Sequence, residues 1–470
     1  MTDSDTLSGS RADARLGPVL ERIDAGLEPA LERLKALLAI PSVSTDPAHA
    51  ADCRRAADWL VADLDAIGFE ARRADTPGHP MVLARGGPQD GPRYLFYGHY
   101  DVQPADPLEL WTRDPFDPVV EETARGRVIR ARGASDDKGQ LMTFVEACRA
   151  WVAVHGALPC GLTLFFEGEE ESGSPSLVPF LRENAEALAA DVALICDTGL
   201  FAGRVPAIVT QLRGMLQEEI VVTAASRDLH SGMYGGAAMN PIRVLAGVIA
   251  ALHGPDGRVQ VPGFYDGVLE LSPEMRADWE ALGFDHRAFL GAVGLSDLAG
   301  EEGRSALEML WSRPTAEPNG IAGGYAGEGF KTVLPAQASA KVSFRLVGEQ
   351  DPHTIRERFR DWVRAMIPAD CAVEFIGHGA SPASRMDISH PAFGRTRAAL
   401  GAEWGAEAAY VGSGGSIPVA GYFRSELGLD TILTGWSRDD DGLHAPNEKY
   451  DVESFHKGMR SWARVLAALS

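Results

Sequence analysis

Five short segments of the chain carry imidazole or carboxylate side chains, the groups that bind metal ions and transfer protons. They are GHYD (His99, Asp101), RGASDDKG (Asp136, Asp137), FFEGEEESGS (Glu167, Glu169, Glu170, Glu171), CDTG (Asp197) and DDDGLHAPNE (His444). Two imidazoles with several carboxylates suit Zn²⁺ or Mn²⁺, whereas imidazole disfavours Ca²⁺ and no EF-hand spacing is present. The set predicts a metal site assembled from distant parts of the chain.

Each pattern taken alone also has a purely structural explanation. An H-x-D pair occurs in surface turns, adjacent aspartates can cap a helix, and a run of glutamates is commonly a solvated loop. In favour of a site, side chains at i and i+2 leave a strand on the same face, so Asp101 can orient His99. Adjacent carboxylates such as Asp136 and Asp137 also repel one another unless a cation or a proton lies between them.

The elements around these segments place them at one edge of a predicted sheet. Helical patterns alternate with apolar runs expected as strands: helices at 17–39, 56–64 and 138–154, strands at 94–97, 162–166 and 192–196. This alternation predicts an α/β fold whose mainly parallel sheet is flanked by helices. His99, Glu167 and Asp197 each follow a strand, and such sheets bind ligands at the carboxyl ends of their strands. We therefore expect one shared site.

The pattern changes between about residues 205 and 383, where a second, α+β domain is expected. Its elements are strands at 218–223, 338–346 and 372–376, the second with the alternation of an edge-accessible strand, and helices at 240–252 and 352–366. The α/β pattern then returns, with a helix near 391–400, apolar runs around Ile417 and Ile432, and a terminal helix. We predict a domain of residues 207–382 inserted into one made of 1–206 and 383–470, since 470 residues exceed the usual size of one core.

The composition argues against several other classes of protein. The net charge of −22 repels nucleic acid and anionic membranes, so neither is expected as a partner. The five cysteines are odd in number and lack C-x-x-C pairs, the first residues are polar, and no apolar run is long enough to span a bilayer. We therefore expect a cytoplasmic protein. Walker loops, nucleophile elbows and dinucleotide fingerprints are also missing from the sequence.

The motifs together resemble those of a known family, in order and over nearly the whole chain. They are GHYDVQPAD, RGASDDKG, EGEEESGS, ICDTG, DLHSGMYGG, PNGIAGGYAGEGFKTVLP, SFRLV, GGSIP and DDGLHAPNEKY. The chain is similar to the dinuclear zinc metallopeptidases that include carnosine dipeptidases, aminoacylases, glutamate carboxypeptidases and succinyl-diaminopimelate desuccinylase, and most similar to the dipeptidase branch. This resemblance implies a zinc exopeptidase-like catalytic domain, an inserted lid and dimerisation domain, a homodimer, and two Zn²⁺ or Mn²⁺ per subunit.

The resemblance also implies roles for individual residues. Asp136 would bridge the two metals, and the remaining ligands would be His99 and Asp197 for one metal and Glu171 and His444 for the other. Asp101 would orient His99, the Asp136–Asp137 peptide would be cis, and Glu170 would be the general base. A carboxylate beside a ligand but free of the metal is well placed to take a proton from water and return it to the departing amine.

Four further residues are implied to contact the substrate. His230 would steady the oxyanion in the partner subunit's site, Arg345 would bind the terminal carboxylate, and Thr332 and Ser416 match smaller contacts. A guanidinium suits the carboxylate because its planar donors can bind both oxygens. Without the resemblance, a capped turn would explain His230 and a cross-strand salt bridge would explain Arg345.

We expect the enzyme to hydrolyse an amide bond in small carboxylate-bearing substrates, foremost dipeptides, using water activated by Glu170. One departure from the dipeptidase pattern bears on the substrate: Gly412 and Ser413 stand before GGSIP, where dipeptidases often carry Arg-Glu to meet a free amino group. An N-acyl or N-carbamoyl amino acid amidohydrolase is therefore an alternative. A non-catalytic metal-binding scaffold is a further alternative, but it would have no need for Glu170 and five intact ligands.

Overall fold

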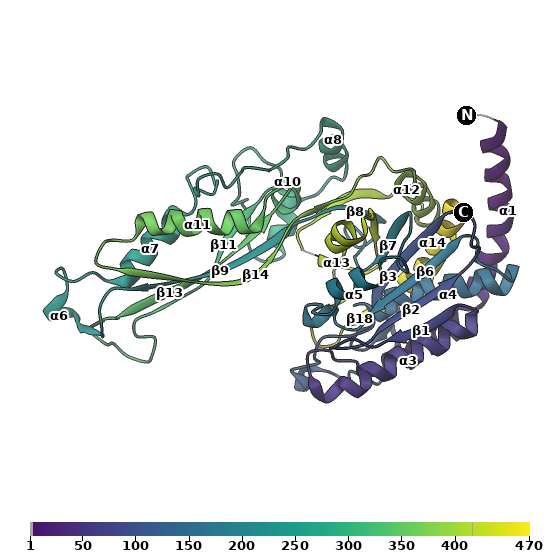
Figure 1. Ribbon diagram of the computed structural model, residues 1–470, viewed down its shortest axis with the longest axis horizontal. Coiled ribbons are helices and arrows are strands. Elements are labelled where there is room, and N and C mark those ends of the chain that lie inside the picture. Colours follow the sequence, from purple (N-terminus) through teal and green to yellow (C-terminus); the bar gives the residue numbers. More distant parts are fainter. Residues whose placement is uncertain (1–2, 416) are drawn as a thin grey trace. The chain divides into compact units, whose positions relative to one another are not determined.

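The computed structural model describes residues 3–415 and 417–470. Their contacts divide the chain into two compact units. Unit 1 contains the described residues of 1–210, 386–410 and 422–470, and unit 2 those of 211–385 and 411–421. Both units are drawn in Figure 1.

Unit 1 is built on a sheet whose central strands are parallel. The sheet runs β1-β2-β6-β3-β7-β17-β8. Its strands are β1 (Glu70–Ala74), β2 (Met81–Gly86), β3 (Arg93–His99), β6 (Gly161–Glu167), β7 (Val192–Cys196), β8 (Ala207–Leu212) and β17 (Thr431–Thr434). Strands β6, β3, β7 and β17 pair in parallel, and the outer pairs are antiparallel. Two further strands, β15 (Ser384–Arg385) and β16 (Ala409–Ser413), pair with β8.

Helices cover both faces of this sheet, which explains why its central strands read as unbroken apolar runs. On one face, Phe96 of β3 packs against α4 (Lys138–His155) and α14 (Val452–Leu469). On the other face, Phe165 of β6 packs against α5 (Leu177–Glu183) and the helical turn Phe423–Leu427. The layered arrangement is visible in Figure 1 and confirms the predicted fold class.

The first predicted helix is in fact two helices. One helix was expected over 17–39, but α1 (Asp3–Ala25) ends before Gly26 and α2 (Leu27–Leu38) begins after it. Pro29 explains the break, because in one continuous helix it could not donate to the carbonyl of residue 25. Leucines recur at helical spacing on both sides of Gly26, so their spacing alone did not reveal the interruption.

The remaining elements of unit 1 complete its helical cover and add a small sheet. They are α3 (Ala50–Ile67), α12 (Pro391–Trp404), three single turns (Pro47–His49, Leu108–Leu110, Glu170–Ser172) and the antiparallel strands β4 (Val119–Thr123), β5 (Gly126–Arg130) and β18 (Lys449–Asp451). Strand β5 lies between β18 and β4. Because β18 closely follows His444, this sheet fixes the chain on one side of that residue.

Unit 2 has an antiparallel sheet in the order β11-β13-β9-β14. The strands are β9 (Gly214–Thr223), β11 (Thr315–Gly323), β13 (Gln337–Leu346) and β14 (Ala372–Ser381). Helices α7 (Pro241–Ala251) and α11 (Pro352–Met366) contribute side chains to its core. Strand β13 lies between β11 and β9, so the expected edge position was wrong: its alternation reflects burial of one face only.

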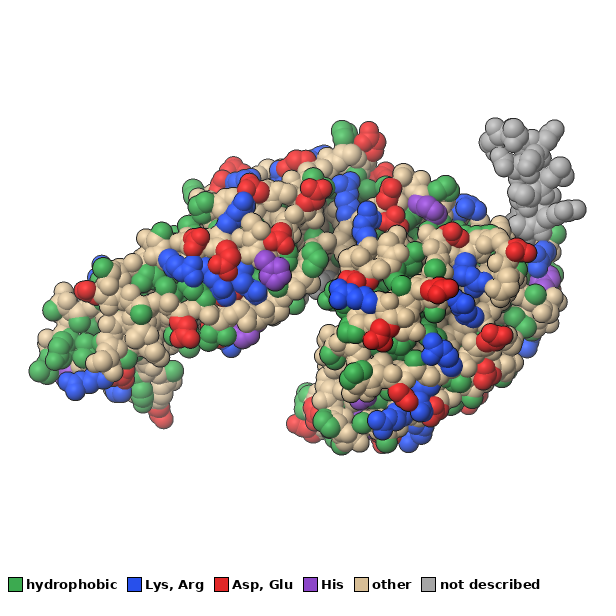
Figure 2. Space-filling view, in the orientation of Figure 1, with side chains coloured by type: hydrophobic (Ala, Val, Ile, Leu, Met, Phe, Trp, Pro, Cys, Tyr) green, Lys and Arg blue, Asp and Glu red, His purple; other side chains and the backbone are tan. Residues whose placement is uncertain are grey.

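Shorter elements complete unit 2. They are β10 (Leu229–His230), β12 (Val333–Leu334), α6 (Ser231–Tyr234), α8 (Pro273–Ala281), α9 (His286–Gly291), α10 (Ala306–Trp311) and α13 (Pro418–Tyr422), whose last residue belongs to unit 1. Acidic and basic side chains are interspersed over both units on the face shown in Figure 2. None of the described helices is both long and apolar enough to cross a membrane.

Candidate metal centre and active site

Three parallel strands of unit 1 end at the same edge of the sheet. In the register of β3 and β6, His99 lies opposite Glu167, and Tyr97 of β3 lies opposite Ile195 of β7. His99, the glutamates after β6 and Asp197 after β7 therefore leave the sheet together. The sequence predicted that these residues would meet at one edge of the sheet. Parallel α/β sheets bind ligands at this edge, the carboxyl ends of their strands.

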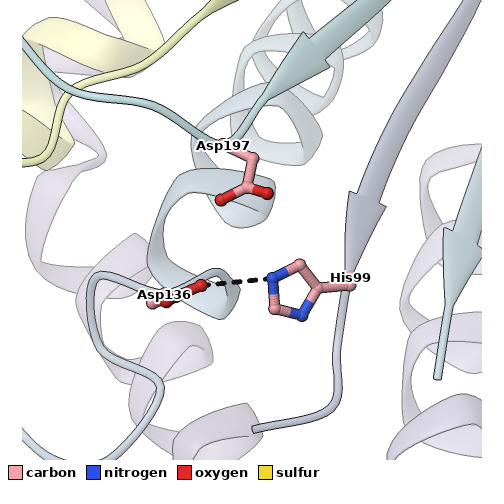
Figure 3. Close-up of side chains that lie close together, drawn as sticks. All are labelled: His99, Asp136 and Asp197. Carbon is pink, nitrogen blue, oxygen red and sulfur yellow. Dashed lines mark hydrogen bonds and ion pairs between the residues drawn. The ribbon is translucent and has the colours of Figure 1, made fainter. Parts of the chain in front are cut away.

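Asp136 lies between the two imidazoles of the centre. Its Oδ1 is 3.2 Å from His99 Nε2, and its Oδ2 is 3.0 Å from His444 Nε2. His444 Nε2 is also 3.4 Å from Glu171 Oε1. Figure 3 shows Asp197 facing both His99 and Asp136 from the end of β7. One carboxylate thus contacts two histidines that are far apart in the sequence.

The five residues implied as ligands form two groups that share Asp136. The potential ligand atoms of His99, Asp136 and Asp197 lie within 4.8 Å of one another, and so do those of Asp136, Glu171 and His444. Each group offers one imidazole and two carboxylates. Three protein ligands are typical of catalytic zinc sites, which keep a coordination position for water or substrate.

The electrostatics of the centre fit divalent cations. Burial raises the pKa of Asp197, and the nearby carboxylates of Asp136 and Glu170 raise it further. Hydrogen bonds that His444 donates to the carboxylates of Asp136 and Glu171 raise the pKa of His444 to about 10, so a proton on this imidazole helps to balance their negative charge. The partner of the buried Oε1 of Glu171 is the His444 imidazole, 3.4 Å away. Cations bound by these atoms would balance the same charge, so the residues present suit two divalent ions.

A third group of carboxylates, in unit 1, contains a lysine where an ion would bind. Asp440, Asp441 and Asp451 also have oxygens within 4.8 Å of one another. The ammonium of Lys449 contacts these carboxylates at 3.0, 2.8 and 2.6 Å, respectively. The positive charge is already present there, so this group is an ion-pair network.

Asp101 organises both His99 and the glutamate loop from a fully buried position. Its Oδ1 is 3.4 Å from His99 Nδ1. The same carboxylate accepts hydrogen bonds from the backbone N–H groups of Glu170 (3.2 Å) and Glu171 (3.0 Å). Asp101 therefore holds one imidazole and, through the backbone, the two glutamates next to it.

The glutamate that ends β6, Glu167, and the three that follow it have different surroundings. Glu167 accepts from Tyr97 Oη (2.7 Å), Glu169 from the N–H groups of His79 (2.6 Å) and Ser176 (2.9 Å), and Glu171 from Gln103 Nε2 (2.7 Å). No described group donates a hydrogen bond to the carboxylate of Glu170. Burial raises the pKa of Glu170 to about 7, with the carboxylates of Glu171 and Asp101 adding to the shift and His99 opposing it. Among the four, Glu170 is therefore distinguished by a carboxylate that accepts no hydrogen bond from a described group.

The loop that carries Asp136 precedes α4 and is fixed by buried groups. Asp137 is at the N-cap position of α4, but its side chain makes no capping hydrogen bond; its Oδ2 accepts from the backbone N–H of His99 at 3.1 Å. The Asp136–Asp137 peptide is cis, as the resemblance implied. Glu448, which the sequence did not single out, accepts hydrogen bonds from this loop and forms an ion pair with Arg132.

Comparison with known proteins identifies the family. A model of the peptidase family M20/M25/M40 matches residues 95–468. The chain belongs to this family. The Cys-Gly metallodipeptidase dug1 of Schizosaccharomyces pombe is 31% identical over 458 residues, which is 93% of this chain and 95% of the relative.

Two solved structures match most of the chain in fold. The metallo-carboxypeptidase Sso-CP2 of Sulfolobus solfataricus superposes with a TM-score of 0.80 at 31% identity, covering 94% of this chain and 99% of that one. Human carnosine dipeptidase 1 superposes with a TM-score of 0.79 at 25% identity, covering 97% of this chain and 98% of that one. The chain therefore belongs to the dipeptidase branch of the M20 family, which confirms the resemblance seen in the sequence.

In this M20 peptidase, three of the four residues expected to contact substrate are described, all in unit 2. His230 is exposed and caps α6, accepting from the N–H of Gly232 at 3.0 Å, which is the capped turn considered from the sequence. Thr332 is exposed just before β12, and Arg345 is half-buried on β13 and forms no ion pair with any described residue. Ser416 lies outside the described residues.

The structure of unit 2 explains why residue 412 is glycine and not the arginine that dipeptidases often carry there. A Cβ added at Gly412 would lie 2.4 Å from Trp311 Cβ and 2.8 Å from its Cγ. Trp311 ends α10, so its Cβ cannot move away without moving the helix. The loop is also fixed by Arg213, whose Nε donates to Gly414 O at 3.2 Å. Any side chain at residue 412 is therefore excluded by the close approach of α10.

Proposed function

We propose that this M20 peptidase hydrolyses the amide bond of dipeptides with two divalent metal ions, Zn²⁺ or Mn²⁺. The observation that carries the proposal is the position of Asp136, shared between His99 and Asp197 on one side and Glu171 and His444 on the other. The two relatives named for cleaving Cys-Gly and carnosine support a dipeptide as the substrate.

The proposed ligands are the five side chains that share Asp136, and the loop geometry keeps Glu170 beside them. When bound, the ions supply Lewis acidity and lower the pKa of water, so that a nucleophile forms near neutral pH. Glu170 takes the proton of the attacking water and later delivers it to the departing amine. Its position beside the proposed ligands and the lack of a hydrogen bond donated to its carboxylate suit a group that must accept and release a proton.

Two residues of unit 2 are proposed to bind the substrate. The Nδ1 atom of His230 accepts a hydrogen bond from Gly232, so the neutral ring carries its proton on Nε2 and can donate from there to an oxyanion. Arg345 has no carboxylate partner among the described residues, so its guanidinium is available for the substrate's terminal carboxylate. Thr332 and Ser416 are proposed as smaller contacts.

We further propose that the enzyme is a homodimer assembled through unit 2, with His230 serving the partner's site. Large apolar side chains are exposed on unit 2 at Met233 (75%), Phe330 (98%) and Ile321 (61%). Figure 2 shows apolar side chains gathered over α6. Exposed apolar surface of this kind is typical of a protein interface.

All five cysteines are unpaired, which supports a reducing compartment such as the cytoplasm.

A second substrate class is favoured by the loop at Gly412. Trp311 excludes any side chain there, and Ser413 offers a hydroxyl that accepts from the N–H of Gly415 at 3.1 Å. Neither residue brings a carboxylate to meet a free amino group. N-acyl and N-carbamoyl amino acids, which have no charged amine, are therefore the alternative substrates.

The test is a substrate panel run at known metal content. The protein is stripped with a chelator, reloaded with Zn²⁺ or Mn²⁺, and assayed with Cys-Gly, β-Ala-His, N-acetyl amino acids and N-carbamoyl amino acids. We expect no hydrolysis in the stripped protein and recovery on reloading, with dipeptides cleaved fastest. Hydrolysis that persists in metal-free protein would refute the mechanism, and preference for acylated amino acids would replace the substrate class.

A further inference from the structure

Two buried charged residues outside the proposed ligand set connect the segments that carry the ligands. Arg132 Nη1 and Glu448 Oε2 are 2.9 Å apart, and the two side chains are 1% and 0% exposed. A buried ion pair costs much desolvation and is often no more stabilising than apolar packing. The hydrogen bonds that the pair makes to neighbouring backbone groups indicate a role in holding the segments that carry the ligands.

Glu448 fixes the backbone of the loop that presents Asp136. Its Oε1 accepts from the N–H groups of Ser135 (2.8 Å) and Asp136 (3.1 Å), and its Oε2 accepts from the N–H of Gly133 (3.0 Å). With Arg132, four donors converge on one carboxylate. A carboxylate makes stronger hydrogen bonds than a neutral acceptor, so Glu448 restrains the backbone of this loop at three N–H groups.

Arg132 extends this network to His444. Its Nη2 donates to the backbone carbonyl of His444 at 3.3 Å and to that of Pro104 at 3.1 Å. His444 has a φ of +61°, in the left-handed region that residues with a Cβ adopt mainly where their surroundings hold them. The Arg132 contact is one such restraint.

We propose that Arg132 and Glu448 are positioning residues for the metal centre. The pair fixes the backbones of Asp136 and His444 relative to one another, which sets the 3.0 Å approach of Asp136 Oδ2 to His444 Nε2. This inference rests on the proposed function, because it assumes that Asp136 and His444 bind a common ion. Groups that orient metal ligands typically increase metal affinity by about 10- to 100-fold.

The experiment measures Zn²⁺ affinity directly, without an activity assay. Metal-free protein is titrated with Zn²⁺ against a competing chelator, and its folded state is checked by thermal unfolding. The variant is the double substitution Arg132→Met with Glu448→Gln, which removes both charges and leaves no unpaired buried ion. The matched control is Glu403→Gln, because Glu403 is also buried (5% exposed) and paired with Arg460 and Arg464 in another part of unit 1.

We expect wild type and the Glu403 variant to bind two Zn²⁺ with the same affinities, and the double variant to bind at least one ion about 10- to 100-fold more weakly while remaining folded. Should the double variant not fold, Glu448→Asp, which keeps the charge but withdraws it from its donors, is expected to show the same loss. Unchanged Zn²⁺ affinities in a folded variant would overturn the positioning role and leave the proposed function intact. A wild type that binds no Zn²⁺ pair would instead remove the proposed function, and this inference with it.

Discussion

Glu170 differs from Glu169, its neighbour in the sequence, in what its carboxylate contacts. Glu169 accepts from the N–H groups of His79 and Ser176, whereas Glu170 receives no hydrogen bond from a described group and lies beside the proposed ligands. We expect Glu170→Gln to lower kcat by about 10²-fold or more, the scale of general acid-base catalysis, with unchanged Zn²⁺ content. Steady-state kinetics and metal analysis check this expectation.

Glu169→Gln is the matched control for this prediction. Because it disturbs buried hydrogen bonds, its main effect should be a free energy of unfolding lower by about 1–3 kcal/mol. Near-normal turnover by the Glu170 variant would exclude Glu170 as the general base.

His444 should make the stability of the metal-free protein depend on pH. Asp136 and Glu171 raise its pKa from 6.5 to about 10, so the folded protein binds this proton more tightly than the unfolded chain does. The resulting stabilisation is fully present below about pH 6.5 and is lost as the pH rises toward 10. His444→Asn should remove this component, and asparagine tolerates the left-handed backbone found there.

The measurement is urea unfolding of both metal-free proteins at pH 6.5 and 9.5. We expect the difference in stability between wild type and His444→Asn to shrink at the higher pH. A constant difference would show that the His444 imidazole is not held by its carboxylate neighbours.

Among individual residues, the sequence predicted those that stand in short motifs rich in histidine, aspartate or glutamate. His99, Asp136 and Asp197 each stand in a short motif next to an expected strand or helix, and the structure brings them together. Glu448 and Arg132 were missed because a single glutamate and a single arginine form no pattern by themselves. The positioning role proposed for them can be inferred only once the structure places the segments around residues 135 and 444 next to each other.

The start of α4 must lie very close to the Asp136 loop. A Cβ at Gly139 would lie 1.9 Å from the carbonyl oxygen of Ala134 and 2.8 Å from Tyr450 Cδ1. Gly139→Ala should therefore displace the loop, lowering the free energy of unfolding by about 1–3 kcal/mol and weakening Zn²⁺ binding. Urea unfolding and Zn²⁺ titration measure the two effects.

Gly247, in the interior of α7, provides the control for this substitution. Apart from its chain neighbours and the backbone of α7 itself, no atom lies within 4 Å of a Cβ added there. Gly247→Ala should stabilise the protein by about 0.5–1 kcal/mol, the helix propensity difference. If both alanine variants behaved alike, the close contact at Gly139 would not constrain the loop.

The sequence predicted elements well where one periodicity dominated and poorly where two explanations fit the same pattern. Strands β6 and β7 read as buried because both of their faces are covered, and α11 read as a helix from its apolar spacing. The break at Gly26 and the inner position of β13 were not predicted. Helical spacing persists across the break, and alternation shows that one face is buried without showing which strands lie beside it.

At the scale of the whole molecule, the proposed homodimer leads to a complementation experiment. His230→Ala should lack oxyanion stabilisation, and His99→Ala should lack a metal ligand. Mixed and refolded together, the two inactive parents should recover part of the activity, because one site in the heterodimer combines intact metal ligands with an intact His230. Activity of the mixture no greater than that of the parents would argue that each subunit uses its own His230.

The central claim is that Asp136 is shared by two divalent ions. Anomalous diffraction at the zinc edge, from crystals grown with Zn²⁺, tests it most directly. The account predicts two peaks per chain, one within bonding distance of His99, Asp136 and Asp197 and the other within bonding distance of Asp136, Glu171 and His444. A single peak, or a pair of peaks that Asp136 does not join, would contradict it.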